Sequence, residues 1–264
     1  CDNNIEYVED FNNADLVITN EHRKTITPRE KTIFITGENI RPNFMLYRYS
    51  LSHDLDEYYG HNCYCPYWYT RIAWPGFKLK LLASTSCDTL TGFIDLKNLI
   101  SKRDLKQLEN RNKFCALIAG NPENLRISLY MFITLFYKKV DTYGNAFGNP
   151  QKQSKYEILK DYKFSLCPEN SFSPGYMTEK LIEAWYAGTL PIWCGPTSIN
   201  GLNHKAFINY QDYNQMKDFV NKISSVDQSD EQFFNMYEQP LFLKKPTIKP
   251  VIEFLKRAIN EIIE

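Results

Sequence analysis

The segment at residues 163–196 constrains the fold of this 264-residue chain more than any other part of the sequence. An apolar run of strand length, residues 164–167, is followed by a turn-rich stretch and then by a helical pattern that begins near Thr178 and ends at Gly188. A second apolar run, residues 190–194, is typical of another buried strand. Strand, loop, helix and strand in this order predict a βαβ unit, and therefore an α/β fold with a parallel sheet.

Two helices of the predicted fold carry a cation where the helix dipole is positive. Lys180 lies in the first turn of the helix that starts near Thr178, and Arg126 lies in the first turn of a helix predicted after the apolar strand at residues 114–119. A cation is unfavourable at a helix N-terminus unless an anion binds there, and phosphates bind at helix N-termini beyond the strand ends of open α/β sheets. The pair predicts a site for a diphosphate. Two alternatives stay open: Lys180 as an ordinary surface lysine, and a helix start at Ser173 that places Lys180 in the helix interior.

The run CPENSFSPGYMTEKLIEAWYAGTLPIWCGP at residues 167–196 resembles the signature of the α-1,3/4-fucosyltransferases, glycosyltransferase family 10. That pattern consists of E-N-S, a short loop with a tyrosine, T-E-K, an alanine-rich helix and a proline-containing strand that ends in glycine. It is far more specific than a lone glycine motif. Pro168 departs from the pattern, in which an aromatic residue usually precedes E-N-S.

The resemblance extends to two further motifs. T-G-E-N-I-R-P-N-F at residues 36–44 is similar to the acceptor-domain motif of the bacterial fucosyltransferases, whose glutamate is taken as the catalytic base; Glu38 holds that place. Glu38 also follows a predicted strand, where functional groups gather in α/β sheets. The alternative is a loop carboxylate that caps nearby main-chain N–H groups. The N-P-x-x-x-R run that ends at Arg126 is similar to the family motif that supplies an arginine to the donor pyrophosphate.

The resemblance implies inverting transfer of L-fucose from GDP-fucose to a hydroxyl of an N-acetyllactosamine-type glycan, which forms an α-1,3 or α-1,4 linkage. It implies no obligatory cofactor or metal and leaves stimulation by a divalent cation open. The partners are then GDP-fucose and an oligosaccharide acceptor that contains N-acetylglucosamine. Another GDP-sugar glycosyltransferase and a non-catalytic glycan-binding module are the alternatives. The site residues that the resemblance implies are Glu38 as base, and Arg126, Asn170, Tyr176, Glu179 and Lys180 as donor-binding residues.

The resemblance also implies two Rossmann-like domains of the GT-B type. We expect an acceptor-binding domain at residues 1–110, a GDP-fucose-binding domain at residues 111–245 and a C-terminal helix at residues 246–264 that packs across the junction. The amphipathic pattern at residues 250–263 supports that helix. The first half is short for a doubly wound domain, so we expect either a truncated N-terminus or an abridged acceptor domain. The charged run at residues 101–113 is the predicted junction, with its charges on a solvated face.

Composition excludes several classes of function. The 31 basic and 31 acidic residues cancel, so no net field attracts nucleic acid. No apolar run approaches the length of a membrane span. Seven cysteines favour reduced thiols in a cytosolic protein, with peripheral membrane association left open; one disulfide among Cys63, Cys65 and Cys87 in a Golgi-type protein is the alternative.

Two further features of the first half carry weaker signals. Asp54 and Asp56 form a D-x-D triplet, which we interpret as solvated loop acids rather than a metal motif. The aromatic residues of the stretch 58–76 are expected mainly in the core and at the domain interface, and a sugar-stacking platform is the lesser alternative.

Overall fold

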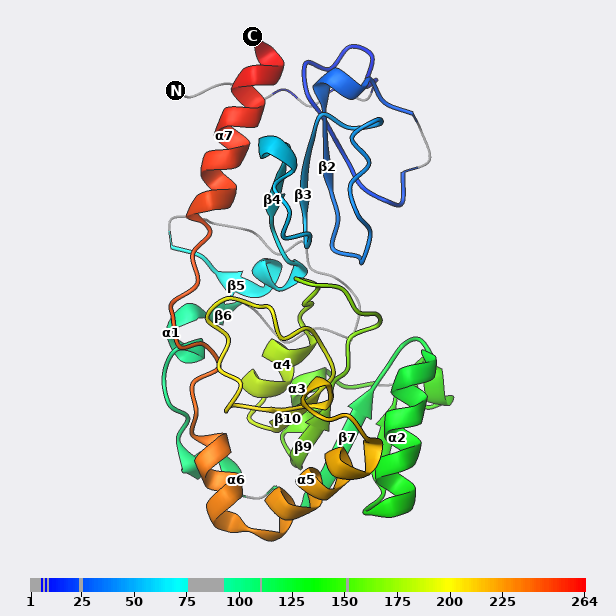
Figure 1. Cartoon of the computed structure of the whole chain (residues 1–264), viewed down its shortest axis with the longest axis vertical. Helices are drawn as coiled ribbons and strands as arrows, with labels where there is room; N and C mark the ends of the chain where they lie inside the picture. Colours follow the sequence, from blue (N-terminus) through cyan, green and yellow to red (C-terminus); the bar gives the residue numbers. More distant parts are fainter. Residues whose placement is uncertain are drawn as a thin grey trace. The chain divides into compact units, whose positions relative to one another are not determined.

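The computed structural model describes residues 6, 8, 10–23, 26–75, 93–109, 111–150 and 152–264 (Figure 1). By contacts the chain divides into two compact units. The first unit comprises Cys1–Tyr67, Ser173–Tyr176 and Thr247–Glu264, and the second comprises Trp68–Phe172 and Met177–Pro246. This division places residues 68–109 in the second unit and the C-terminal segment in the first. The domain boundaries given above remain a prediction.

The first unit is built on a four-stranded parallel sheet in the order β1-β2-β3-β4. Each strand is short and rich in β-branched or aromatic residues, the composition that pleated, half-buried surfaces favour. A turn precedes β3, in which Asn43 accepts hydrogen bonds from the main-chain N–H groups of Met45 and Leu46. The strands are β1 (Val17–Thr19), β2 (Thr32–Ile35), β3 (Tyr49–Ser52) and β4 (Asn62–Tyr64).

The C-terminal helix α7 (Lys249–Ile263) packs beside β4 in this unit (Figure 1). Its buried residues Val251, Phe254 and Ala258 lie three and four positions apart, which is the spacing of one helix face. The ring of Phe254 meets that of Tyr49 edge to face at 5.9 Å, and the Tyr49 hydroxyl donates a hydrogen bond to Glu261. The amphipathic pattern therefore predicted this helix correctly.

The second unit contains a five-stranded parallel sheet in the order β11-β10-β9-β7-β8. Strand β8 follows β7 on one side, and the chain then returns to add β9, β10 and β11 on the other side. The strand order thus reverses between β7 and β9, where open α/β sheets bind their ligands. The strands are β7 (Lys113–Ile118), β8 (Val140–Tyr143), β9 (Tyr162–Leu166), β10 (Leu190–Trp193) and β11 (Ile208–Asn209).

Helices cover both faces of this sheet. Leu129 of α2 and Phe219 of α5 join one hydrophobic core cluster, and Ile158 of α3 joins another with Ala116 of the central strand. The α/β class and the predicted βαβ unit are confirmed. The helices are α2 (Asn124–Phe136), α3 (Lys155–Leu159), α4 (Lys180–Tyr186), α5 (Met216–Gln228) and α6 (Asp230–Tyr237); a two-stranded sheet of β5 (Ile72–Ala73) and β6 (Ile94–Asp95) precedes α1 (Leu96–Leu99).

Most of the charged side chains in the run at residues 101–113 are exposed, as expected, but two of its arginines are turned inward. Arg103 is 6% exposed and donates hydrogen bonds to the main-chain oxygens of Tyr237, Trp185 and Thr189 at 2.7–2.9 Å. Its guanidinium stacks 3.8 Å above the Tyr237 ring. Burial lowers the pKa of Arg103 to about 9. Arg111 likewise donates hydrogen bonds to the main-chain oxygens of Leu159, Tyr162 and Ala187. Leu159 and Ala187 stand at the ends of α3 and α4, where main-chain carbonyls lack a donor within their own helix.

Replacing Arg103 by methionine should lower the free energy of unfolding by about 3 kcal/mol, because several buried carbonyls lose their donor. Urea unfolding followed by circular dichroism measures the change. Lys102→Met is the matched control: the Lys102 side chain is 73% exposed, so its loss should change stability by no more than about 0.5 kcal/mol. Equal stability of the two variants would show that the carbonyls do not depend on Arg103.

Candidate active site

The loop after β9 is organised by one buried carboxylate. Glu169 is 2% exposed and accepts hydrogen bonds from the main-chain N–H of Thr178 at 2.9 Å and from its hydroxyl at 2.6 Å. Threonine is a common N-cap residue, but the Thr178 hydroxyl donates to Glu169, and the N-cap position of α4 belongs to Glu179. The helix still begins at Lys180, so the predicted first-turn position of this lysine is confirmed. Gly188, with φ of +80°, follows the helix end as predicted.

Arg126 is the third residue of α2 and is 4% exposed. Its guanidinium donates a hydrogen bond to the main-chain oxygen of Asn121 and another, of 2.5 Å, to Asn170 Oδ1. Asn121 follows β7 and Asn170 follows β9. Two residues that were predicted to bind the donor, Arg126 and Asn170, thus meet at the point where the strand order reverses.

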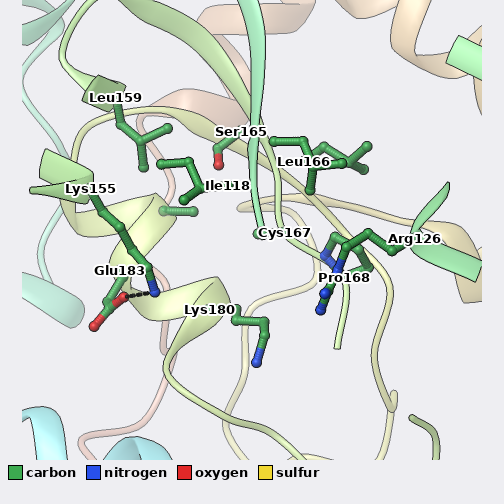
Figure 2. A pocket seen from close by; sticks show the side chains of 12 residues that line it. Ile118, Arg126, Lys155, Leu159, Ser165, Leu166, Cys167, Pro168, Lys180 and Glu183 are labelled. Carbon is green, nitrogen blue, oxygen red and sulfur yellow. Dashed lines mark hydrogen bonds and ion pairs between the residues drawn. The ribbon is translucent and has the colours of Figure 1, made fainter. Parts of the chain in front are cut away.

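Lys180 lies in the same pocket as Arg126. Its Nζ is 2.9 Å from Thr178 Oγ1, 3.5 Å from Glu169 Oε2 and 3.9 Å from Glu179 Oε1. Figure 2 shows the nitrogen atoms of Lys155, Lys180 and Arg126 directed toward the lower part of the view, away from Leu159 and Ser165. The cavity volume of this pocket is about 30 Å³. It is lined by Leu117, Ile118, Arg126, Lys155, Leu159, Ser165, Leu166, Cys167, Pro168, Lys180, Glu183 and Ala184.

Lys155, the first residue of α3, is a third cation that the sequence interpretation missed. Its Nζ lies 3.0 Å from Glu183 Oε2 and 3.6 Å from Glu179 Oε1. The signal was present in the sequence, because Ser154 is an N-cap residue directly followed by a lysine, the same anomaly as at the other two helix starts.

The pKa values of two carboxylates near these cations are shifted in opposite directions, down for Glu179 and up for Glu169. Burial alone raises the pKa of Glu179, but the nearby charges of Lys180 and Lys155 bring it down to about 2. Burial raises the pKa of Glu169, and the attraction of Lys180 offsets only part of that rise. The Glu179 carboxylate is therefore anionic at neutral pH, at the start of α4.

Glu38 belongs to the first unit, directly beyond β2. Its side chain is exposed. Among the described residues its hydrogen bonds are made by its main chain: the N–H donates to Thr36 Oγ1 at 3.1 Å, and the carbonyl accepts from the N–H of Ile40 at 2.8 Å. The carboxylate is thus presented on a fixed loop at the carboxyl end of the sheet, where it can act as a base.

Tyr176 lies with Glu38 in the first unit rather than with Arg126 and Lys180. Its ring is 1% exposed and meets the His53 ring edge to face at 5.2 Å. Gly175 has φ of +83°, and a Cβ there would stand 2.2 Å from the main-chain oxygen of His53. The segment Ser173–Tyr176 is held further by a 2.6 Å hydrogen bond from the Ser173 hydroxyl to Asn39, the neighbour of Glu38.

The structure also bears on three weaker predictions for the first half of the chain: the D-x-D acids, the cysteines and the aromatic stretch. Asp54 is not solvated: it is 4% exposed and accepts hydrogen bonds from Tyr58 and Arg41. Cys63 and Cys65 carry free thiols, whereas Cys87 lies outside the described residues. Among the described aromatic residues of the stretch 58–75, Trp68 and Trp74 are buried in the core.

The described residues contain neither a metal-binding cluster nor a membrane-spanning helix. They contain no group of three or more His, Cys, Asp or Glu side chains arranged to hold a metal ion. None of their helices combines the length and the apolar character that crossing a membrane requires.

The chain is similar in sequence to known fucosyltransferases. A sequence model described as "Glycosyltransferase family 10 (fucosyltransferase) C-term" matches residues 108–241. Alpha-(1,3)-fucosyltransferase FucT of Helicobacter pylori is 26% identical over 260 residues, which cover 87% of this chain and 53% of that protein. Human 4-galactosyl-N-acetylglucosaminide 3-alpha-L-fucosyltransferase 9 is 31% identical over 121 residues, 44% of this chain and 33% of the human protein. The chain spans about half the length of the bacterial relative and a third of the human one.

The crystal structure of an alpha1,3-fucosyltransferase with GDP resembles this chain with a TM-score of 0.70 and 25% identity, over 94% of this chain and 78% of the other. The predicted GT-B type of α/β fold, with two parallel sheets, is therefore confirmed.

Proposed function

The chain belongs to glycosyltransferase family 10, and from that premise we propose that it transfers L-fucose from GDP-fucose to a hydroxyl of an acceptor glycan. The acceptor is an N-acetyllactosamine-type glycan, and the bond formed is an α-1,3 or α-1,4 linkage to its N-acetylglucosamine. The names of the bacterial and human relatives support the transfer of fucose, and the name of the human relative supports an acceptor that contains galactose and N-acetylglucosamine. The anomeric centre of fucose is inverted, because one direct displacement exchanges GDP for the acceptor oxygen.

The observation that carries the proposal is the shared pocket of Arg126 and Lys180 at the strand-order reversal. Two cations that converge on helix starts form a site for a diphosphate, because the N–H groups of the helix and the fixed charges act on the same anion. A non-catalytic glycan-binding module would leave both cations, which are costly to hold in this position, without a ligand.

The chemistry divides between the two units. In the first, the Glu38 carboxylate accepts the proton of the acceptor hydroxyl as its oxygen forms the bond to the anomeric carbon. In the second, the bond from that carbon to the β-phosphate oxygen breaks, and Arg126 and Lys180 stabilise the negative charge that GDP gains. The Glu179 carboxylate accepts hydrogen bonds from the ribose hydroxyls, while Asn170 contacts the phosphates. The charges that the chain supplies make a metal ion dispensable.

Calorimetry and product analysis test this proposal together. We expect GDP-fucose to bind at least roughly tenfold more tightly than GDP-mannose, about 1.4 kcal/mol in binding free energy. With N-acetyllactosamine as acceptor, the chain should form a fucosylated trisaccharide in the presence of EDTA, and the linkage follows from nuclear magnetic resonance of the product. Tighter binding of GDP-mannose would assign another GDP-sugar as donor. Binding of N-acetyllactosamine without any product would favour a glycan-binding module.

A further inference from the structure

The role proposed for the pocket uses two of its three cations, and the third, Lys155, is equally well placed. It is 18% exposed and begins α3, whose N-terminus lies at the same pocket. A lysine that served only to solubilise the surface would extend into water. Lys155 instead contacts two carboxylates of the second unit, Glu179 and Glu183.

These contacts form a chain of alternating charges. Arg71 Nε lies 3.2 Å from Glu183 Oε1, and Lys155 lies between Glu183 and Glu179. Lys180 then lies between Glu179 and Glu169. Buried carboxylates cost several kcal/mol unless each has a cationic partner. Glu183 has both Arg71 and Lys155 as cationic partners, and Lys155 reaches Glu179 as well.

The contact between Lys155 and Glu179 affects how strongly Glu179 attracts Lys180. Glu179 now has Lys155 at 3.6 Å and Lys180 at 3.9 Å, so its charge is shared by two cations. Without Lys155, the Glu179 carboxylate would attract the ammonium group of Lys180 more strongly, because no second cation would offset its charge. Lys180 would then be held by Glu179 and Glu169 and would be less available to an incoming diphosphate.

We propose that Lys155 is a positioning residue for donor binding, which holds the Glu179 carboxylate ready for the ribose of a nucleoside diphosphate sugar and leaves Lys180 free for its diphosphate. This inference rests on the proposed function of the same pocket. Lys155 itself does not touch the reacting atoms.

The pH dependence of donor binding reports this role. The charged groups that face Glu179 are Lys155 on α3, Lys180 and Glu183 on α4, Arg71, and Glu169 beyond β9. Loss of Lys155 removes one of the cations that lower the pKa of Glu179, so that pKa rises. The carboxylate is then lost at a higher pH than in the natural chain, and binding that depends on its anionic form weakens as the pH falls.

The variant Lys155→Met tests the proposal by calorimetric titration with GDP between about pH 5 and pH 8. We expect the dissociation constant for GDP and the KM for GDP-fucose to rise roughly tenfold, with kcat changed by less than about twofold. The weakening should grow toward the acidic end of the range, whereas the natural chain should show a flatter profile. Lys155→Arg should restore most of the affinity, because it keeps the charge.

Lys160→Met is the matched control, since Lys160 follows the same helix, is 53% exposed and forms its ion pair with the nearby Glu157. It should bind GDP as the natural chain does. A double-mutant cycle with Glu179→Gln adds a second readout: once the carboxylate is gone, Lys155→Met should have little further effect. If Lys155→Met does not fold, the cycle is run with Lys155→Gln.

Three results are decisive. The proposal is overturned if a folded Lys155→Met variant binds GDP with the affinity and the pH profile of the natural chain. It is also overturned if Lys155→Met lowers GDP affinity in the Glu179→Gln background as much as it does in the natural chain. If the natural chain itself does not bind GDP, the proposed function fails, and that failure is distinguished because no variant is needed to see it.

Discussion

Replacing Glu38 by glutamine should reduce fucose transfer roughly 10²–10⁴-fold while GDP-fucose still binds, because the acceptor hydroxyl loses the group that takes its proton. Glutamine matches the size of glutamate but cannot act as a base. Donor binding is expected to persist because the pocket of Arg126 and Lys180 belongs to the second unit, whereas Glu38 belongs to the first. Initial rates at saturating acceptor and calorimetric titration with GDP-fucose measure the two quantities separately.

The control for this experiment is Glu57→Gln. Glu57 is another exposed loop carboxylate of the first unit, so its replacement removes the same charge from the same unit. It should leave the turnover rate unchanged. Near-normal transfer by the Glu38 variant, or an equal loss in both variants, would remove Glu38 from the role of base.

Local patterns predicted the parts of this fold that depend on local physics. The run at residues 163–196 gave β9, α4 and β10 in order, because strand and helix periods are visible in a single segment. The first-turn positions of Arg126 and Lys180 followed from the same reasoning, combined with the direction of the helix dipole. That both cations line one pocket required the strand order β9-β7, which only the folded structure gives.

The errors share a cause, which is that contacts made only in the folded chain decide where a polar side chain lies. Thr178 has the sequence of an N-cap, yet the buried Glu169 takes its hydroxyl. Arg103 lies in a charged run, yet its acceptors at Trp185, Thr189 and Tyr237 are more than 80 positions away in the sequence. Asp54 was misjudged in the same way, because Arg41 and Tyr58 pair with it inside the first unit. Periodicity carries no information about such partners.

Replacing Arg126 by methionine should lower kcat/KM for GDP-fucose roughly 10²–10³-fold, the range expected when one preorganised charge donor is lost from a site that stabilises a developing anion. Arg126 is buried and its guanidinium is fixed by Asn121 and Asn170, so no reorganisation is needed when the diphosphate arrives. Arg126→Lys should recover little, because an ammonium group cannot bind Asn121, Asn170 and a phosphate oxygen with the same planar geometry. Lys180→Met should cause a loss of similar size.

Shortened ligands show whether this loss arises at the diphosphate. The natural chain should bind GDP more tightly than guanosine, and the Arg126→Met variant should lose most of that difference while guanosine binds as before. Lys139→Met, which removes an 81%-exposed lysine of the same unit, should keep the preference for GDP. An equal loss of affinity for GDP and guanosine in the Arg126 variant would mean that the preference for GDP, and with it the phosphate contacts, survives without Arg126. The diphosphate site would then have to lie elsewhere, since the preference for GDP over guanosine measures only the contacts made by the phosphates.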